Sequence, residues 1–131
     1  MKKIGTLNQP LSTAIASMGH MDTLVIADAG LPIPHRAQRI DLALTAGIPS
    51  FLETVRVVLA ELEVERAIIA EEMLITSPQV HTALMELLGD IPVETLSHET
   101  LKENTSSART IVRTGEFTPY ANVILVSGVV F

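Results

Sequence analysis

A histidine and an aspartate flank one short apolar segment near the amino terminus. His20 precedes the Leu-Val-Ile run of residues 24–26, and Asp28 follows it. Such a run is typical of a strand buried on both faces of a sheet. Because ligands of open α/β sheets bind beyond the carboxyl ends of strands, Asp28 is expected to face a cleft. His20 then lies at the other end, so a site that used both would need a bent loop or a residue from a neighbouring copy.

Both residues also have an ordinary structural interpretation, which the sequence leaves open. Asp28 could cap the helix or turn that follows the strand. His20 could be a loop histidine with satisfied hydrogen bonds, because functional groups are a minority of all titratable residues. Similar polar residues at other predicted strand ends favour the functional interpretation.

Another histidine is expected at the start of a helix. His98 follows Ser97 directly after a predicted strand, which puts it in a first helical turn at a strand's carboxyl end. The positive end of the helix dipole disfavours an imidazolium there, so a neutral ring suited to binding a hydroxyl is expected. Lys102 lies four residues later on the same helix face.

The only tyrosine of the chain lies in a turn that also carries an asparagine. Tyr120, Ala121 and Asn122 follow Pro119 between two predicted strands. A phenol offers an apolar face with a hydroxyl, and an amide offers both a donor and an acceptor. The turn therefore suits a small polyhydroxylated ligand. The alternative is a plain turn in which Asn122 bonds the backbone.

Other titratable residues have no evident role in the sequence. His35 lies beside Arg36 in a proline-containing loop, and His81 is expected on a solvent-exposed helix face. Glu71 and Glu72 form a carboxylate pair at a predicted strand end. None of these residues receives a chemical assignment.

Several reaction classes lack their motifs. The sequence contains no glycine-rich dinucleotide fingerprint, no P-loop and no GxSxG nucleophile elbow. It has no cysteine, which excludes disulfides, thiolate catalysis and cysteine-bound zinc. No histidine spacing marks a metal site, although His20, Asp28 and His98 could still converge on one.

Composition predicts a single domain over residues 1–131 that binds neither nucleic acid nor membranes. The hydrophobic fraction is 47% and the mean hydropathy is +0.39, which is high for a chain with 18% charged residues. Such a small apolar domain is expected to bury surface in a homo-oligomer. A net charge of −6 and few aromatic residues argue against nucleic acid and anionic membranes. Without a membrane span or an uninterrupted signal-peptide core, the protein is expected to be cytoplasmic.

Strands alternate with helices along the chain. This order predicts a three-layer α/β/α fold with a mixed, mostly parallel sheet of about six strands. Helix starts are indicated at Asn8, at a capping box of Ser50 and Glu53, and at Ser77 and Ser97. Helices are expected over residues 8–18, 51–62 and 78–88 and just after Ser97, and strands over residues 24–28, 39–44, 67–70, 92–96, 108–113 and 122–126. The last two strands are joined by too few residues for a crossover helix, so they are expected to pair antiparallel.

Three stretches together resemble one enzyme family. They are residues 19–22 (GHMD), 26–34 (IADAGLPIP) and 113–122 (RTGEFTPYAN), and the Ser-His-Glu of residues 97–99 agrees with them. In length and motif order the whole chain is similar to the D-ribose pyranase and L-fucose mutarotase family. The Leu-Pro-Ile-Pro loop of residues 31–34 resembles the ribose branch rather than the fucose branch.

The resemblance implies an isomerase that converts D-ribose between pyranose and furanose rings in ribose utilisation, without a metal or redox cofactor. By likeness, His20 corresponds to the catalytic acid, and Asp28, His98 and the 120–122 turn correspond to sugar-binding positions. Lys102 is expected to join them because it shares the helix face of His98. Family members form rings, often two pentamers stacked as a decamer, with pockets between neighbours. The general base stays open between His98, Asp28 and water.

Two other functions stay open at this point. The first is a non-catalytic sugar-binding module associated with ribose uptake, which would use the same pocket. The second is a metal-dependent aldose–ketose isomerase with His20, Asp28 and His98 as metal ligands. A ring-opening enzyme would accelerate ring exchange of ribose without forming a ketose. A binding module would not accelerate the exchange, and an aldose–ketose isomerase would form a ketose.

Overall fold

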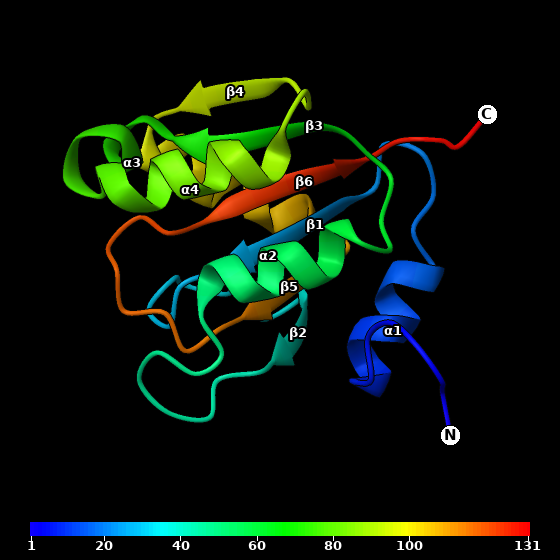
Figure 1. The fold of residues 1–131 in the computed structure, drawn as a ribbon. Coiled ribbons are helices and arrows are strands. Elements are labelled where there is room, and N and C mark those ends of the chain that lie inside the picture. The colour runs from blue at the N-terminus through cyan, green and yellow to red at the C-terminus, as the bar shows by residue number, and fades with distance from the viewer.

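Short strands and helices follow one another along the chain, and the strands form one six-stranded sheet (Figure 1). The computed structural model describes residues 1–131. In chain order the elements are α1 (Gln9–Ala16), β1 (Thr23–Ala27), β2 (Gln38–Asp41), α2 (Phe51–Leu59), β3 (Val64–Ala70), α3 (Glu71–Thr76), α4 (Pro78–Leu88), β4 (Val93–Leu96), α5 (His98–Asn104), the 3-10 helix η1 (Thr105–Ser107), β5 (Thr110–Arg113) and β6 (Val123–Ser127). The predicted α/β class with a mixed sheet of about six strands is confirmed.

The direction of β6 decides which loops meet. The strand order is β2-β5-β1-β6-β3-β4, and every pairing is parallel except the two that β6 makes with β1 and β3. Because β6 runs antiparallel, it begins at the edge where β1 and β3 end (Figure 1). Residues just after β1 therefore lie beside residues just before β6.

The predicted antiparallel pairing of the last two strands with each other is wrong. β1 lies between β5 and β6 in the sheet. Residues 114–122 carry the chain past the end of β1, so β6 enters the slot between β1 and β3. All five residues of β6 are buried there, and the strand forms ladders on both sides. A hairpin with β5 would have given β6 only one ladder.

The two faces of the sheet pack on separate apolar cores. Along β1, Leu24 and Ile26 belong to the larger core, while Val25 and Ala27 belong to the smaller one. Side chains of α1, α2 and α4 complete the larger core, and Leu101 of α5 closes the smaller one. This burial on both faces explains why the strand is a continuous apolar run.

Most predicted helix starts are confirmed by capping bonds. Side-chain oxygens accept backbone N–H groups of the first turn at three of them: Asn8 from Leu11, Ser50 from Glu53, and Ser97 from Thr100. Ser77 precedes α4 as predicted but makes no capping bond. Its Oγ instead donates to the carbonyl of Pro119 at 2.6 Å, which ties α4 to the turn before β6.

Element boundaries differ from the predicted ones at several places. α1 ends at Ala16 rather than residue 18, α2 ends at Leu59 rather than residue 62, and β2 covers Gln38–Asp41 rather than 39–44. β3 begins at Val64 rather than residue 67. Between residues 70 and 78, where no element was predicted, the chain forms the helix α3, and the helix dipole favours the carboxylates of Glu71 and Glu72 in its first turn. None of the helices is long and apolar enough to cross a lipid bilayer.

Candidate functional site

Asp28 and Asn122 lock each other in place at the carboxyl edge of β1. Asp28 follows β1, and Asn122 precedes the antiparallel β6, so the two meet although they are far apart in the chain. The Asp28 backbone N–H donates to Oδ1 of Asn122 at 2.9 Å, and Nδ2 of Asn122 donates to Oδ2 of Asp28 at 2.8 Å. Asn122 is fully buried. Because the amide is immobile, it fixes the direction of the carboxylate.

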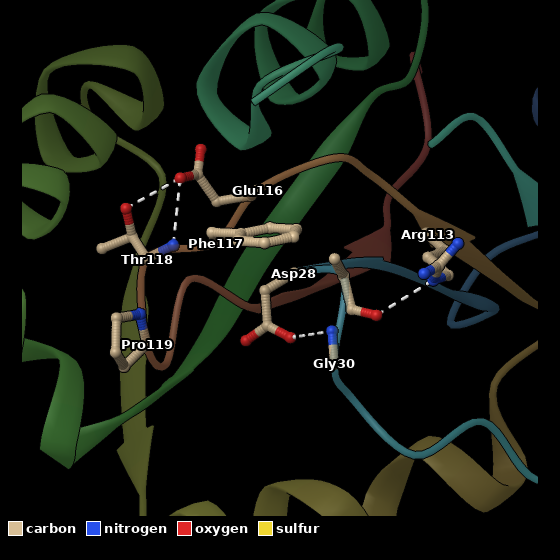
Figure 2. A pocket seen from close by; sticks show the side chains of 8 residues that line it. Asp28, Gly30, Arg113, Glu116, Phe117, Thr118 and Pro119 are labelled. Carbon is tan, nitrogen blue, oxygen red and sulfur yellow. Dashed lines mark hydrogen bonds between the residues drawn. The ribbon is translucent and has the colours of Figure 1, made fainter. Parts of the chain in front are cut away.

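The other oxygen of Asp28 shapes the turn that follows. Oδ1 of Asp28 accepts the backbone N–H of Gly30 at 2.9 Å (Figure 2). The structural interpretation, in which Asp28 caps a turn, is thus correct for one oxygen. Each carboxylate oxygen can accept more than one hydrogen bond, so both retain capacity toward a ligand.

A cavity of about 370 Å³ opens beside Asp28. Its walls come from the turn after β1 and the loop that leads from β5 to β6, and its lining residues are Asp28, Ala29, Gly30, Arg113, Glu116, Phe117, Thr118 and Pro119 (Figure 2). This volume lies in the range of small-molecule sites. The cavity has carboxylate, guanidinium and hydroxyl groups on its wall, which suits a polyhydroxylated ligand rather than an apolar one.

Glu116 and Arg113 support the cavity walls. Glu116 accepts the backbone N–H of Phe51 at the start of α2, and both the N–H and the hydroxyl of Thr118. Burial raises the pKa of Glu116, but these hydrogen bonds outweigh it and hold the pKa below its ordinary value. Arg113 donates from Nε to the carbonyl of Ala29 and from Nη1 to Asp41. Both side chains therefore join separate segments into one rim.

His98 and Tyr120 form an aromatic pair at the same edge of the sheet. Their ring centroids are 5.0 Å apart with an interplanar angle of 83°, an edge-to-face contact. Tyr120 has a φ of 62°, which its turn requires before Asn122. The His98 backbone N–H donates to the carboxylate of Glu72, so that glutamate holds the start of α5. Nδ1 of His98 is buried without a hydrogen-bond partner in the chain.

Lys102 and Ala121 have limited means of touching a ligand directly. Nζ of Lys102 lies 2.6 Å from Oε1 of Glu99, and its hydrogen bond and charge hold the pKa of Glu99 below the ordinary value. Ala121 is buried with its methyl group in the larger core. Any contact from Ala121 must therefore come from its backbone.

His20 lies at the opposite edge of the sheet from Asp28. β1 separates the two, and its five residues span about 16 Å at the usual rise of a strand. Nε2 of His20 is 2.9 Å from Oε2 of Glu65, and the imidazole is 54% exposed. One chain thus brings Asp28, Asn122, Tyr120 and His98 to one edge and leaves His20 at the other.

Sequence reasoning assigned no role to three carboxylates that hold parts of the structure in place. Glu72 holds the start of α5, Glu116 clamps the cavity rim, and Glu65 pairs with His20. Their partners are 26, 65 and 45 positions away in the chain, so no local spacing reveals them. His81, expected on an exposed face, is half-buried on α4. His35 is exposed.

No group of three or more histidine, aspartate or glutamate side chains in the chain is arranged to hold a metal ion. The three ligands considered for a metal isomerase are not brought together, since His20 lies across the sheet from Asp28 and His98.

Comparison with known proteins decides the family. A model described as the RbsD / FucU transport protein family matches residues 1–130. The chain belongs to this family. Two relatives named D-ribose pyranase, from Coprothermobacter proteolyticus and Chloroflexus aggregans, are each 58% identical over 131 residues, with both chains fully covered. The family resemblance found in the sequence motifs is confirmed.

Solved structures of the RbsD / FucU family share the fold. Bacillus subtilis RbsD complexed with D-ribose is 46% identical, has a TM-score of 0.97 and is covered completely, as is this chain. The fucose mutarotase in complex with L-fucose from Streptococcus pneumoniae has a TM-score of 0.80 at 24% identity, with 95% of each chain covered. The second likeness concerns the fold alone.

Proposed function

We propose that this member of the RbsD / FucU family converts D-ribose between its pyranose and furanose rings by general acid–base catalysis. The observation that carries the proposal is the match, over the full length of both chains, to an RbsD bound to D-ribose. The full-length identity of 58% to proteins named D-ribose pyranase agrees with it. The enzyme is an isomerase of carbohydrate metabolism.

The reaction moves protons and one carbon–oxygen bond. A base removes the proton of the anomeric hydroxyl, the carbonyl forms, and the bond from the anomeric carbon to the endocyclic oxygen breaks while an acid protonates that oxygen. A different hydroxyl then attacks the carbonyl, loses its proton to a base, and the carbonyl oxygen is protonated again. No carbon–hydrogen bond breaks and no electron is transferred, so acid–base groups and positioning suffice. A placed imidazole accelerates such a step by about 10²–10⁴-fold.

We assign His20 as the acid toward the endocyclic oxygen and the opposite edge as the sugar-binding surface. Support for binding by Asp28 comes from its fixed carboxylate on the cavity wall. Support for His98 comes from its buried Nδ1, and Tyr120 presents its phenol against the same ring. Lys102, Ala121 and Asn122 complete the proposed binding set, with Ala121 acting through its backbone and Asn122 through Asp28.

A complete site then requires a second copy of the chain. A pentose is far shorter than the roughly 16 Å that β1 places between the two edges. We propose that His20 of one subunit reaches the Asp28 edge of a neighbour in a ring of subunits, as in two stacked pentamers. Exposed apolar side chains near both edges, Met21 and Phe117, are suited to such contacts. We further propose that the enzyme works in the cytoplasm, which fractionation of cells would test.

Saturation-transfer NMR on ribose at equilibrium tests the proposed activity. The wild-type protein should accelerate exchange between the pyranose and furanose signals. His20→Ala should reduce this acceleration by about 10²-fold or more, because it removes the acid. His81→Ala, which removes a half-buried imidazole outside the site, is the matched control and should keep wild-type exchange.

The same experiment distinguishes the two other functions. Binding of ribose without any acceleration of ring exchange would identify the protein as a non-catalytic binding module. Appearance of ribulose, together with loss of activity after exhaustive chelation, would identify it as a metal-dependent isomerase. Neither result is expected.

A further inference from the structure

The imidazole of His20 is paired with a carboxylate from a distant part of the chain. Nε2 of His20 lies 2.9 Å from Oε2 of Glu65, which is 45 positions later, at the start of β3. The two side chains are 54% and 35% exposed. Ion pairs as exposed as this one contribute little to folding stability. A role in orienting the ring therefore explains the contact better than a role in holding the fold.

Glu65 reaches His20 from a β-bulge. The β3–β6 ladder pairs Val64 with Ser127 and Arg66 with Val126, which leaves Glu65 as the extra residue on β3. A bulge bends the strand and redirects the extra side chain, and bulges are frequent beside active sites. The irregularity thus aims the carboxylate of Glu65 instead of leaving it in the regular alternation of the strand.

The backbone around His20 is held as firmly as its ring. The N–H of Gly19 donates to Oδ2 of Asp22, and the N–H of Asp22 donates to the carbonyl of Gly19, which closes a turn. The Met21 N–H donates to the carbonyl of Ser127, which fastens this turn to β6. Glu65 adds the contact that fixes the rotation of the side chain within this turn.

The chemistry of the pair determines which ring nitrogen is free. An ionised carboxylate accepts hydrogen bonds but cannot donate one, so the proton between the two groups belongs to Nε2. Nδ1 is then the nitrogen that can exchange a proton with a ligand. When both nitrogens are protonated the ring is positive, and the charge of Glu65 faces it, as a buried aspartate does in a serine protease triad.

We propose that Glu65 is a positioning residue: it holds Nε2–H of the His20 imidazolium so that Nδ1–H delivers its proton to the endocyclic oxygen, which leaves a neutral ring with its proton on Nε2. This inference rests on the proposed ribose ring-opening activity. It adds to that activity the identity of the reacting atom and the group that presents it.

Nitrogen-15 NMR of histidine-labelled protein, combined with ribose exchange kinetics, tests the inference. Neutral His20 should carry its proton on Nε2 in the wild type and become a tautomer mixture in Glu65→Ala. The same variant should lose about tenfold or more in kcat with little change in KM, because orientation of the acid and not ribose affinity is lost. Glu65→Gln retains an acceptor oxygen and should recover part of kcat and the Nε2–H tautomer.

Glu94→Ala is the matched control. It removes an ion pair of similar exposure with Arg66, the residue next to Glu65, and changes the charge equally. It should leave kcat and the tautomer unchanged. The inference is overturned if Glu65→Ala keeps the wild-type kcat, or if neutral His20 in the wild type carries its proton on Nδ1. If His20→Ala still loses activity in that case, the proposed function stands without the inference. If the wild type itself fails to accelerate ring exchange, the proposed function is overturned and the inference falls with it.

Discussion

A buried amide places a negative charge on the wall of the candidate sugar cavity. Asn122 has its carbonyl oxygen and one N–H engaged with Asp28, so the carboxylate cannot rotate away. The remaining lone pairs of Asp28 point where hydroxyl groups can reach them. At the level of single residues, the candidate binding surface is therefore preorganised by a side chain that is itself fully buried.

Exchanging these two side chains separates their structural and functional roles. Asn122→Asp sets two carboxylates against each other at a contact of 2.8 Å, and we expect it to lower the free energy of unfolding by about 2–4 kcal/mol. Adding Asp28→Asn restores one amide and one carboxylate, so part of this loss should return. Chemical denaturation of the single and double variants measures the effect.

The double exchange should not restore activity, because its charge no longer lies on the cavity wall. Asp28→Asn alone keeps the acceptor for Gly30 but turns its NH2 group toward Nδ2 of Asn122, so it serves as the control for loss of charge without two facing carboxylates. A double variant with wild-type exchange rates would show that the position of the carboxylate is unimportant for ribose.

Single residues of the candidate site could be singled out in the sequence, but their pairing could not. Asp28 was predicted from its place after an apolar strand, and the 120–122 turn from its residue types. That Asn122 holds Asp28 depends on β6 lying antiparallel beside β1, a contact between positions 94 residues apart. Roles that depend on a partner from elsewhere in the sheet have no local signature.

At the level of elements, one glutamate joins the cavity rim to the start of α2. Glu116 accepts from Phe51 in the first turn of α2 and from Thr118 in its own loop. The adjacent Gly115 is closely packed as well, because a Cβ there would meet the carbonyl oxygens of Thr45 and Ile48 at 2.5 Å. The loop before β6 is therefore fixed on both sides.

Glu116→Gln should lower the free energy of unfolding by about 1–3 kcal/mol at pH 7, because hydrogen bonds to a charged acceptor are weakened. The pKa of Glu116 is held below its ordinary value of 4.5, so the carboxylate stabilises the fold fully above that pH. The difference between wild type and variant should shrink as the pH falls below 4.5, because the unfolded carboxylate is protonated first and the folded one only at its lower pKa. Denaturation curves from pH 3 to 7 measure it.

Glu86→Gln on the exposed face of α4 is the control and should match the wild type across this range. A stability difference for Glu116→Gln that stayed constant down to pH 3 would contradict the assigned role of the charge.

Elements with local signals could be predicted, whereas their arrangement could not. Asn8, Ser50 and Ser97 identify helix starts because capping involves residues only three positions apart. The place of β6 depends instead on which slot buries its five apolar residues best, and a short connection to β5 wrongly favoured a hairpin. The helix α3 was missed because its six residues are too few to show a helical period.

For the whole molecule, the proposed roles of His20 and Asp28 make activity a property of an assembly. The two residues lie at opposite ends of β1, so under this proposal each chain would offer one half of a site to each of two neighbours. In a closed ring, the His20 edge of every chain would meet the Asp28 edge of the next chain, because head-to-tail contacts repeat around the symmetry axis.

Mixing two inactive variants tests this arrangement. His20→Ala and Asp28→Asn should each lack activity, while oligomers reassembled from equal amounts should regain about a quarter of the wild-type rate, since that share of interfaces receives both intact residues. Saturation-transfer NMR and light scattering on the same samples measure rate and mass. Mixtures that stay inactive, in oligomers shown to exchange subunits, would contradict a shared site.

The central position of β6 also makes one short strand responsible for two features of the molecule. Without residues 123–127, the strand pairings would divide into β2-β5-β1 and β3-β4, each with an unpaired edge. β6 joins these two groups and carries Asn122 into contact with Asp28. Closure of the sheet and placement of the candidate ligand-binding carboxylate therefore depend on the same five residues.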